Sequence, residues 1–336
     1  MSKKDRMQGT SIEIDEEVHG RFDQRNNIFG RLLNDPEFFL YRTSMFELSR
    51  EISSQDIEGY TDIDFARVQG AWAVYNHFHQ AFSWDGMTEA NTVMEDAPVH
   101  RYEIEDEKEM SELVKETGKI YGASKVGITK IDERWIYTHE REGNRISIPE
   151  DYENAIVLLI EMDRDIIDKS PSMTTGVENA LTYSKMAFVI GCMAKFVREL
   201  GYKAIPMGND TALSIPLAVK AGLGKLGRNG LLITPELGPS VKICKVFTDM
   251  PLVPDVSRGY NLLDACSDCK KCADACEVDA IQFEKEPSFK TFSKSNNKGL
   301  KRWAVDVERC YRFWVENGGD CSTCISACPF INGKSF

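Results

Sequence analysis

The spacing of eight cysteines near the carboxyl end of the chain is the strongest chemical signal in the sequence. Four follow the pattern C-x2-C-x2-C-x3-C between residues 266 and 276, and four follow C-x10-C-x2-C-x3-C-P between residues 310 and 329. Cysteines this close in a turn rarely reach disulfide geometry, and zinc sites usually present their cysteines as pairs. Three thiolates at two-residue intervals instead surround one [4Fe–4S] cluster, while the fourth cysteine points to a second cluster. We therefore predict two [4Fe–4S] clusters.

The order of the cysteines assigns each thiolate to a cluster, because in two-cluster ferredoxins the fourth cysteine of a run binds the other cluster. The first cluster is expected to take Cys266, Cys269, Cys272 and Cys328. The second cluster is expected to take Cys276, Cys310, Cys321 and Cys324. The long gap after Cys310, and Glu277 where a proline is common, depart from the compact pattern without removing a thiolate. Cys192 and Cys244 stand in apolar stretches and are expected to be buried structural thiols.

Two clusters can transfer electrons over a short distance, and the chain is much longer than electron transfer alone requires. It has 336 residues, of which 42% are hydrophobic and 28% are charged, as in ordinary globular proteins. Lys and Arg total 41 against 53 for Asp and Glu, so the formal net charge is −12, which argues against generic nucleic-acid binding. We therefore expect the residues before the cysteines to hold the electron acceptor.

The sequence contains no segment that we expect to export or anchor the protein. The longest clear apolar run, at residues 155–160, has the length of a strand and not the roughly 20 residues of a membrane span. The amino end, MSKKDRMQGT, has no apolar segment behind it and no paired arginines. We expect a soluble protein, cytoplasmic if the chain is complete. It would lie on the outer face of the cytoplasmic membrane if it is the mature part of an exported precursor.

Three regions follow one another along the chain. They are an aromatic-rich region at 1–105, an α/β core at 106–258 and the cluster module at 259–336. The helices expected in the core lie at 107–121, 178–200 and, in a short form, 214–222. The strands expected in the core lie at 125–129, 155–161, 202–206, 231–234 and 241–247. The helix at 178–200 is the clearest, because its apolar residues recur every three or four positions up to Gly201.

The glycine-rich stretch GLGKLG, residues 222–227, matches the dinucleotide pattern G-x-G-x-x-G. That pattern requires a strand before it, and the preceding segment has the pattern of a helix. We therefore expect no nicotinamide or flavin Rossmann site. The glycines still allow the backbone to approach something large and flat, or simply to make tight turns.

Several longer stretches resemble one protein family. AGLGKLGRNGLLITPELGPSVKICKVFTDMPLVPD, residues 221–255, resembles the signature of corrinoid-dependent reductive dehalogenases. TYSKMAF, GYKAIPMGND and CYRFWVENGGDCSTCISACPF resemble the same family in the same order, and RFDQRNNIFGR fits its mature amino end. The resemblance therefore covers most of the chain.

The resemblance implies an α+β fold with a nitroreductase-like corrinoid-binding core at 106–258 and a ferredoxin-like two-[4Fe–4S] module. Region 1–105 would contribute to the substrate pocket. The implied cofactor is a cobalamin-type corrinoid bound base-off, and the sequence agrees in containing no D-x-H-x-x-G motif. The implied activity is reductive dehalogenation, the reaction of organohalide respiration.

The resemblance also implies roles for individual residues. Tyr183 matches the family's proton donor, Lys242 its basic partner and Asn209 a polar residue near the substrate. The aromatic residues expected in the substrate pocket are Phe29, Trp84 and Trp314. The residues expected to contact the corrinoid are Gly222, Leu223, Gly224, Arg228, Asn229 and Gly230. Without the resemblance, Tyr183 would be interpreted as a packing residue, Lys242 as a solvated lysine and Asn209 as a turn residue.

These roles agree with the chemistry of removing a halide from an unactivated carbon. The step needs a strong reductant, which Co(I) supplies and which low-potential clusters regenerate one electron at a time. Tyrosine has an unperturbed pKa of about 10, so it is protonated at neutral pH and can donate. The nearby ammonium of Lys242 is expected to stabilise the tyrosinate and to lower the pKa of Tyr183 toward the working range.

The implied partners are a small organohalide substrate and an external low-potential electron donor. A membrane anchor protein and a second copy of the chain in a homodimer follow from exported relatives, and no nucleic acid is expected. Two alternative functions stay open. An epoxyqueuosine reductase would share the corrinoid core and the clusters but act on tRNA with an aspartate donor, where this chain has Tyr183 and reads GRNG in place of GKNT. An electron-transfer protein that uses only the clusters would contain iron and sulfide without cobalt.

Overall fold

A four-stranded antiparallel sheet lies at the centre of the computed structural model, which describes residues 12–55, 57–78, 100–256 and 262–332. The strand order is β1-β2-β6-β3, and each neighbouring pair is antiparallel. The strands are β1 (Lys125–Lys130), β2 (Asn154–Glu161), β3 (Ala204–Met207) and β6 (Val241–Thr248). A separate two-stranded ribbon contains β4 (Lys225–Leu226) and β5 (Leu232–Ile233). All five predicted strand segments therefore contain a strand.

The two central strands, β2 and β6, have buried side chains on both faces of the sheet. In β2 the residues from Ala155 to Ile160 are all buried, and a strand that is covered on both faces has this continuous apolar pattern. In β6 successive side chains alternate between the faces. Lys242 therefore lies on the same face as Cys244, and Lys245 lies on the same face as Phe247.

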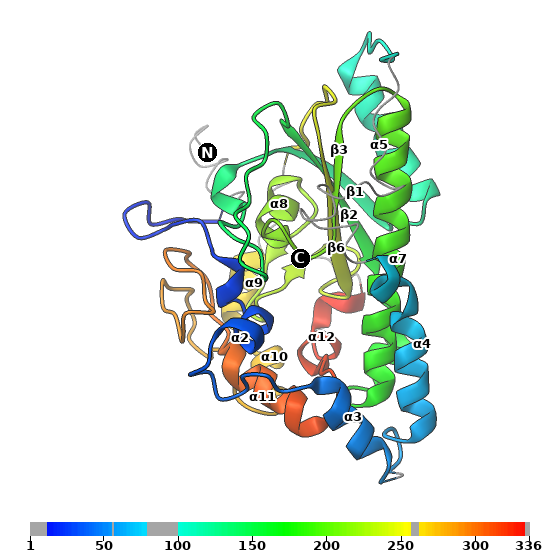
Figure 1. The fold of residues 1–336 in the computed structure, drawn as a ribbon. Coiled ribbons are helices and arrows are strands. Elements are labelled where there is room, and N and C mark those ends of the chain that lie inside the picture. Colours follow the sequence, from blue (N-terminus) through cyan, green and yellow to red (C-terminus); the bar gives the residue numbers. More distant parts are fainter. Residues whose placement is uncertain (1–11, 56, 79–99, 257–261, 333–336) are drawn as a thin grey trace.

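Helices cover both faces of the sheet, as Figure 1 shows. The helices are α4 (Asp62–Phe78), α5 (Glu107–Ile120), α7 (Met173–Glu199) and α8 (Ser214–Lys220). α5 and α7 pack on one face, α8 packs on the other, and α4 packs along the outer side of α7. The region before residue 105 thus contributes a helix directly to the core.

α7 is, among the described residues, the one helix that is long and apolar enough to cross a membrane by length and composition. The expectation that no segment reaches this length is therefore wrong for α7. Of its most apolar window, 56% is buried inside the protein, where α7 packs against the sheet and α4. These contacts are those of a core helix.

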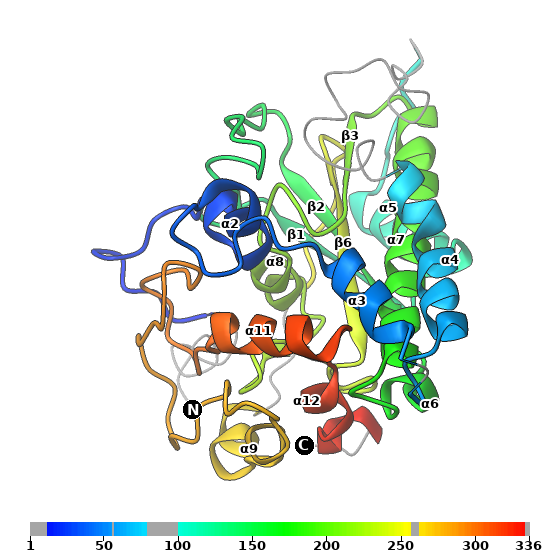
Figure 2. The ribbon, with the colours of Figure 1, turned by 60° about the horizontal axis from the view of Figure 1, so that its bottom comes forward.

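The cluster module and the first helices gather at one end of the core, as Figure 2 shows. The module contains α9 (Leu262–Asp268), α10 (Lys271–Asp274), α11 (Val307–Asn317), α12 (Thr323–Ser326) and η6 (Pro329–Asn332). The other short elements are η1 (Gln24–Asn26), α2 (Ile28–Asn34), α3 (Met45–Ser53), η5 (Glu133–Trp135) and α6 (Arg164–Ile167). α2 packs against α11 and α3 against α4, so the first helices join the module to the core.

Candidate functional site

A small cavity of about 20 Å³ is lined by four cysteines from two separate parts of the module; we call it the cluster-one cavity. The four are Cys266, Cys269, Cys272 and Cys328. The fold thus brings together the set that the order of the sequence assigns to the first cluster. Within the described ranges, no three His, Cys, Asp or Glu side chains converge on a position for a single metal ion.

Arg228 forms part of the wall of the cluster-one cavity and holds the loop that carries its first three cysteines. Arg228 is 1% exposed. Its Nη2 donates to the carbonyl of Cys266 at 2.6 Å, and its Nε donates to the carbonyl of Cys269 at 3.1 Å. Its Nη1 donates to the carbonyls of Gln282 and Glu284, both at 2.8 Å. The guanidinium of Arg228 is thus committed to the cluster-one loop, and its assignment as a corrinoid contact stays a prediction.

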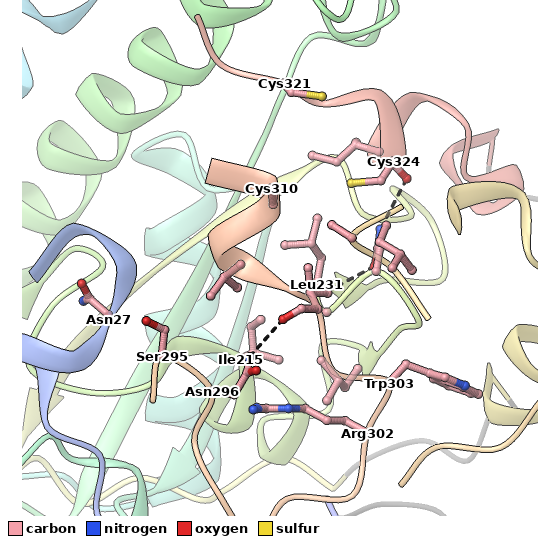
Figure 3. A pocket seen from close by; sticks show the side chains of 18 of the residues that line it. Asn27, Ile215, Leu231, Ser295, Asn296, Arg302, Trp303, Cys310, Cys321 and Cys324 are labelled. Carbon is pink, nitrogen blue, oxygen red and sulfur yellow. Dashed lines mark hydrogen bonds between the residues drawn. The ribbon is translucent and has the colours of Figure 1, made fainter. Parts of the chain in front are cut away.

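A larger cavity of about 490 Å³ carries the other four cysteines at one end; we call it the cluster-two cavity. These cysteines are Cys276, Cys310, Cys321 and Cys324. They are the set assigned to the second cluster. Figure 3 shows three of them grouped on one side, with Ile215 and Leu231 of the core and Asn296 and Trp303 of the module around the rest of the cavity. The cluster-two cavity therefore lies between the α/β core and the module.

Two of the six predicted corrinoid contacts, Asn229 and Gly230, line the cluster-two cavity. Asn229 Nδ2 donates to the carbonyl of Cys324 at 3.4 Å, so this turn joins the core to the second cysteine set. The positive φ of Gly230, 74°, is a conformation that residues with a Cβ rarely adopt. The turn therefore presents backbone directly to the cavity.

The remaining predicted contacts, Gly222, Leu223 and Gly224, lie away from this cavity. Gly222 has a φ of 72° just after the end of α8, where glycine commonly terminates a helix. Leu223 is buried in the apolar core that α8 covers. A Cβ at Gly224 would come within 2.6 Å of the carbonyl oxygen of Ile233. These residues shape the turn, and their assignment to the cofactor stays a prediction that the lining of this cavity does not support.

An aromatic cavity of about 620 Å³ lies beside the cluster-two cavity. Its rings are Phe29, Phe46, Phe65, Trp72, Tyr75, Tyr183, Tyr311 and Trp314. They come from α2, α3, α4, α7 and α11. Phe29 and Trp314, which the sequence predicts here, have ring centroids 6.3 Å apart. Trp84 lies outside the described residues.

The aromatic and cluster-two cavities meet at a junction, which we define by the lining residues that they share, Asn179, Asn209, Lys242 and Trp314. Tyr183 lines the aromatic cavity at this point. Asn209 Nδ2 donates to Tyr183 Oη at 3.1 Å, and Lys242 Nζ lies 5.3 Å from the centroid of the Tyr183 ring. The structure thus brings together the three residues with predicted catalytic roles.

The ring of Tyr183 is fixed between helices α7 and α4. Trp72 stacks on it, with centroids 5.3 Å apart and an interplanar angle of 28°. Tyr75 meets it edge-on at 5.2 Å. Contacts of this kind restrict the ring to one orientation, so the hydroxyl stays at the junction.

Burial acts in opposite directions on the two ionisable groups at the junction. It raises the pKa of Tyr183, and the hydrogen bond from Asn209 offsets part of that rise. Burial lowers the pKa of Lys242, while the negative charges of Asp320 and Glu178 act to raise it. The expected lowering of the pKa of Tyr183 by Lys242 is therefore wrong. The ammonium lies over the ring, and the effect of burial on the hydroxyl is larger.

Lys245 is a buried cation that the sequence analysis did not single out. It is 0% exposed, and its Nζ donates to the carbonyls of Gly208 and Asp210 at 2.9 Å and to Ser214 Oγ at 3.0 Å. These bonds hold the turn that presents Asn209 to the junction. Burial lowers the pKa of Lys245 to about 8. The available signal was a second lysine in the apolar stretch VKICKVF, on the opposite face of the strand from Lys242.

The sequence analysis also did not identify two carboxylates near Lys242, the buried Glu178 and the half-buried Asp320. Glu178 is 1% exposed and accepts hydrogen bonds from Thr182 Oγ1 and from the backbone N–H of Asp163, both at 2.9 Å. Asp320 lines the aromatic cavity next to the second cysteine set. Because both charges favour the ammonium form of Lys242, they partly offset its burial.

Comparison with known proteins agrees with this arrangement. The 4Fe-4S dicluster domain family matches residues 265–332. A tetrachloroethene reductive dehalogenase of Desulfitobacterium hafniense is 33% identical over 81% of this chain and 62% of its own length. The corresponding enzyme of Sulfurospirillum multivorans is 33% identical over 75% of this chain and 56% of its own length. An epoxyqueuosine reductase of Bacillus subtilis is 28% identical over 36% of this chain and 29% of its own length.

Solved structures with the same fold cover nearly the whole chain. The structure of a B12-dependent reductive dehalogenase aligns with 97% of this chain and 44% of its own, with a TM-score of 0.72 and 21% identity. A catabolic reductive dehalogenase aligns with 96% of this chain and 43% of its own, with a TM-score of 0.71 and 22% identity. The predicted α+β fold with a two-cluster module is confirmed. The chain spans about three-fifths or less of each curated relative described here.

Proposed function

We propose that this chain, which is similar to tetrachloroethene reductive dehalogenases, removes a halide from an organic substrate by reduction. The carbon–halogen bond breaks, the halide leaves, and a carbon–hydrogen bond forms with two electrons and one proton. An external low-potential donor supplies the electrons. The observation that carries the proposal is the meeting of Tyr183, Lys242 and Asn209 between an aromatic cavity and a cavity that ends in four cysteines.

The cluster-two cavity fits a large, mostly apolar cofactor with polar edges. Asn179 Oδ1 and Trp314 Nε1 are buried at its wall and have no hydrogen-bond partner within the described part of the chain. Because buried polar atoms normally have partners, these two atoms favour a bound group. Asn229, Gly230 and Asn179 would hold a corrinoid there. When bound, the corrinoid supplies the cobalt-centred reduction of the carbon–halogen bond, with electrons from the two clusters.

The eight cysteines are proposed as the cluster ligands, in the two sets that line separate cavities. The match of residues 265–332 to the dicluster domain family supports both sets. Arg228 orders the loop of the first set through its hydrogen bonds to the backbone. Asn229 connects the second set to the core through the carbonyl of Cys324.

Tyr183 is the proposed proton donor. Its raised pKa keeps the hydroxyl protonated at neutral pH, so the proton is available at the junction. When the proton leaves Oη, the tyrosinate accepts the N–H of Asn209, which already lies 3.1 Å away. The ammonium of Lys242 provides the compensating positive charge, and the low dielectric of a closed cavity strengthens that attraction.

Lys242 can perform this role only while it is charged. Burial alone would favour its neutral form, and Asp320 and Glu178 oppose that effect. Their negative charges therefore favour the ammonium form beside a tyrosine that must pass through an anionic state. We therefore assign Asp320 and Glu178 to maintaining the charge of Lys242.

Anaerobic reconstitution with a corrinoid, iron and sulfide tests the proposed function. The purified protein is analysed for cobalt and iron and then assayed for halide release with reduced viologen as donor. We expect both metals and release of halide from at least one organohalide. Iron without cobalt would instead support a cluster-only electron carrier. Both metals with activity only on a tRNA carrying epoxyqueuosine would support the epoxyqueuosine reductase alternative. The membrane anchor protein, the homodimer and the cellular location stay predictions.

A further inference from the structure

The stretch between the two cysteine sets is positively charged in an otherwise acidic chain, and nothing in the preceding mechanism uses this charge. Residues 283–302, which we call the basic segment, contain five lysines, one arginine and two glutamates, a formal net charge of +4. The rest of the chain carries −16, which gives the total of −12. The backbone of Ser288 pairs with that of Arg302, so the segment folds back on itself. Figures 1 and 2 show it, in orange, at the outer edge of the module.

The basic segment begins at the wall of the cluster-one cavity. Arg228 Nη1 donates to the carbonyl of Glu284 at 2.8 Å, while Nη2 of the same guanidinium donates to the carbonyl of Cys266 at 2.6 Å. Lys285 Nζ lies 3.7 Å from a carboxylate oxygen of Asp268, which stands between the first two cysteines of the first set. The segment therefore lies directly beside the loop that is proposed to bind the first cluster.

Three phenylalanines of the basic segment are exposed. Phe283 and Phe289 are each 41% exposed, and Phe292 is 40% exposed. Lys290 Nζ lies 4.8 Å from the centroid of the Phe292 ring and 3.8 Å from a carboxylate oxygen of Glu284, so these side chains form one continuous surface. Single exposed apolar side chains are common, but several together, rimmed by polar groups, mark an interaction surface. We call this surface the Phe–Lys patch and define it as Phe283, Lys285, Phe289, Lys290 and Phe292.

The two lysines of the Phe–Lys patch are available to a partner. Lys285 is 70% exposed and Asp268, its neighbour, is 83% exposed. Lys290 is 50% exposed and Glu284, its neighbour, is 60% exposed. Ion pairs between side chains as exposed as these contribute little to stability and are screened by salt. The carboxylates of an approaching acidic protein can therefore replace the aspartate and the glutamate as partners of the lysines.

The positions of the two cysteine sets indicate where electrons enter the protein. The second set lines the cluster-two cavity, which meets the aromatic cavity at the junction, so the second cluster would lie next to the proposed corrinoid. The first set lines a separate cavity, and its loop contacts the Phe–Lys patch. An electron carrier that docks on the patch would therefore reduce the first cluster, and the second cluster would pass the electron toward the junction.

We propose that the Phe–Lys patch is the docking surface of the electron donor, a small acidic protein that carries single electrons at low potential. The proposal rests on the proposed function and names the partner class that supplies its electrons. At each encounter the carrier loses one electron and the first cluster gains one, so two encounters supply the two electrons that halide release consumes. The lysines would attract the acidic carrier to a region where the acidic chain does not repel it. The phenylalanines would provide the apolar contact of a small, transient interface.

Stopped-flow reduction of the reconstituted holoprotein tests this assignment without an organohalide. The probe is flavodoxin hydroquinone, an acidic one-electron donor, and the appearance of its blue semiquinone gives the second-order rate constant. We expect this constant to fall roughly tenfold between about 20 mM and about 300 mM NaCl. Lys285→Glu combined with Lys290→Glu should lower the constant at low salt roughly tenfold. Phe289→Ser should lower it severalfold. Reduction by methyl viologen radical, a small cation that needs no docking surface, should stay within about twofold of the wild type in every variant.

Lys130→Glu is the matched control, because Lys130 is also an exposed lysine beside a glutamate, Glu153, but lies in β1. It should keep the rate constant of the wild type. Equal constants in wild type and in the double lysine variant would overturn the proposal, as would a constant that does not depend on salt. Binding of tRNA or of anionic lipid vesicles through the same lysines, with flavodoxin reduction unchanged by the variants, would overturn it in favour of an RNA or a membrane surface.

The same measurements separate the docking surface from the proposed function. Reduction of the clusters that depends on the two lysines, with no halide released from any organohalide, would uphold the docking surface and overturn the proposed function. Halide release with reduced viologen, together with flavodoxin reduction that ignores the patch variants, would overturn the docking surface and uphold the proposed function.

Discussion

The cluster-one cavity and the junction each contain a cation, the buried Arg228 and the half-buried Lys242, but they differ in whether their polar groups have hydrogen-bond partners. At the cluster-one cavity the guanidinium of Arg228 donates to the carbonyls of Cys266, Cys269, Ser267, Gln282 and Glu284. At the junction, Asn179 Oδ1 and Trp314 Nε1 have no hydrogen-bond partner among the described residues. The guanidinium of Arg228 is therefore satisfied by the fold itself, whereas the junction has a donor and an acceptor left unpaired.

This difference suggests different roles for the two sites: Arg228 supports the structure of the cluster-one cavity, and the junction binds ligands and transfers a proton. A buried polar group left unpaired costs roughly 1–3 kcal/mol, so a site with several such groups is stable only if something else satisfies them. The small volume of the cluster-one cavity, about 20 Å³, leaves space only between the cysteines. The junction opens into cavities of about 490 and 620 Å³. We therefore place binding and proton transfer at the junction and structural support at the cluster-one cavity.

Removing the proton donor should give the largest effect on turnover. Tyr183→Phe keeps the ring contacts with Trp72 and Tyr75 but deletes the hydroxyl. Halide release should fall roughly 100-fold or more, the usual contribution of a positioned acid. Metal content and the unfolding temperature should stay close to the wild type. Near-normal turnover would remove Tyr183 from the mechanism and weaken the contrast between the two sites.

Removing the charge at the junction should give the next largest effect. Lys242→Met removes the ammonium over the Tyr183 ring, so we expect a loss of about tenfold to 100-fold in kcat. Lys242→Arg keeps the charge and should be impaired less. The measurement is the rate of halide release, with the spectra of the clusters recorded alongside and expected to stay unchanged. Equal activity of the Met and Arg variants would show that the charge is not what matters at this position.

Removing Arg228 from the cluster-one cavity should affect the assembly of the first cluster and not the chemical step. Arg228→Met leaves several buried carbonyls without a donor, so the free energy of unfolding should fall by about 2 kcal/mol or more. The iron bound by the first cysteine set should be lost preferentially, as measured by iron content and electron paramagnetic resonance. Lys285→Met is the control, because Lys285 is an exposed cation of the same module. Full iron content in Arg228→Met would contradict the holding role.

Replacing Lys245 should have the smallest effect on turnover, and it should change how the stability of the protein depends on pH. Burial lowers its pKa to about 8 from the ordinary 10.5, so the folded protein binds fewer protons than the unfolded chain between these values. The contribution of Lys245 to stability therefore rises with pH across that window. Relative to wild type, the free energy of unfolding of Lys245→Met should fall as the pH increases from 8 toward 10.5. If the free energies of unfolding of wild type and variant, measured in urea, changed in parallel with pH, this prediction would be contradicted. Turnover should fall only severalfold, because losing the Lys245 hydrogen bonds loosens the turn that carries Asn209.

The sequence predicted the parts of the site that depend on local spacing. The two cysteine sets are recognisable because each cluster draws three ligands from one short run, and the structure groups them as the order implies. Tyr183, Lys242 and Asn209 were identified through the resemblance of their motifs to one family, and they lie in a helix, a strand and a turn, respectively. The start of α7 at Met173 was missed, because residues 173–177 show no apolar repeat.

Side-chain direction within turns was harder to predict. Arg228 and Asn229 are adjacent, yet one turns to the cluster-one cavity and the other lines the cluster-two cavity. No residue-level pattern distinguishes the two before the chain is folded. Arg141, which lines the aromatic cavity, belongs to a loop whose position depends on contacts with α2, which lies more than 100 residues earlier. Such residues are visible only once distant segments are placed together.

The most direct test of the central claim is the ratio of cobalt to iron when the cluster-two cavity is filled. Ile215 lines this cavity, as Figure 3 shows, and Ile215→Trp would occupy the space proposed for the corrinoid, while Ile215→Ala would enlarge it. We predict one cobalt for two clusters in the reconstituted wild type and in Ile215→Ala, and clusters without cobalt in Ile215→Trp. A wild type that carries its iron but no cobalt, or an Ile215→Trp variant with unchanged cobalt, would contradict the account.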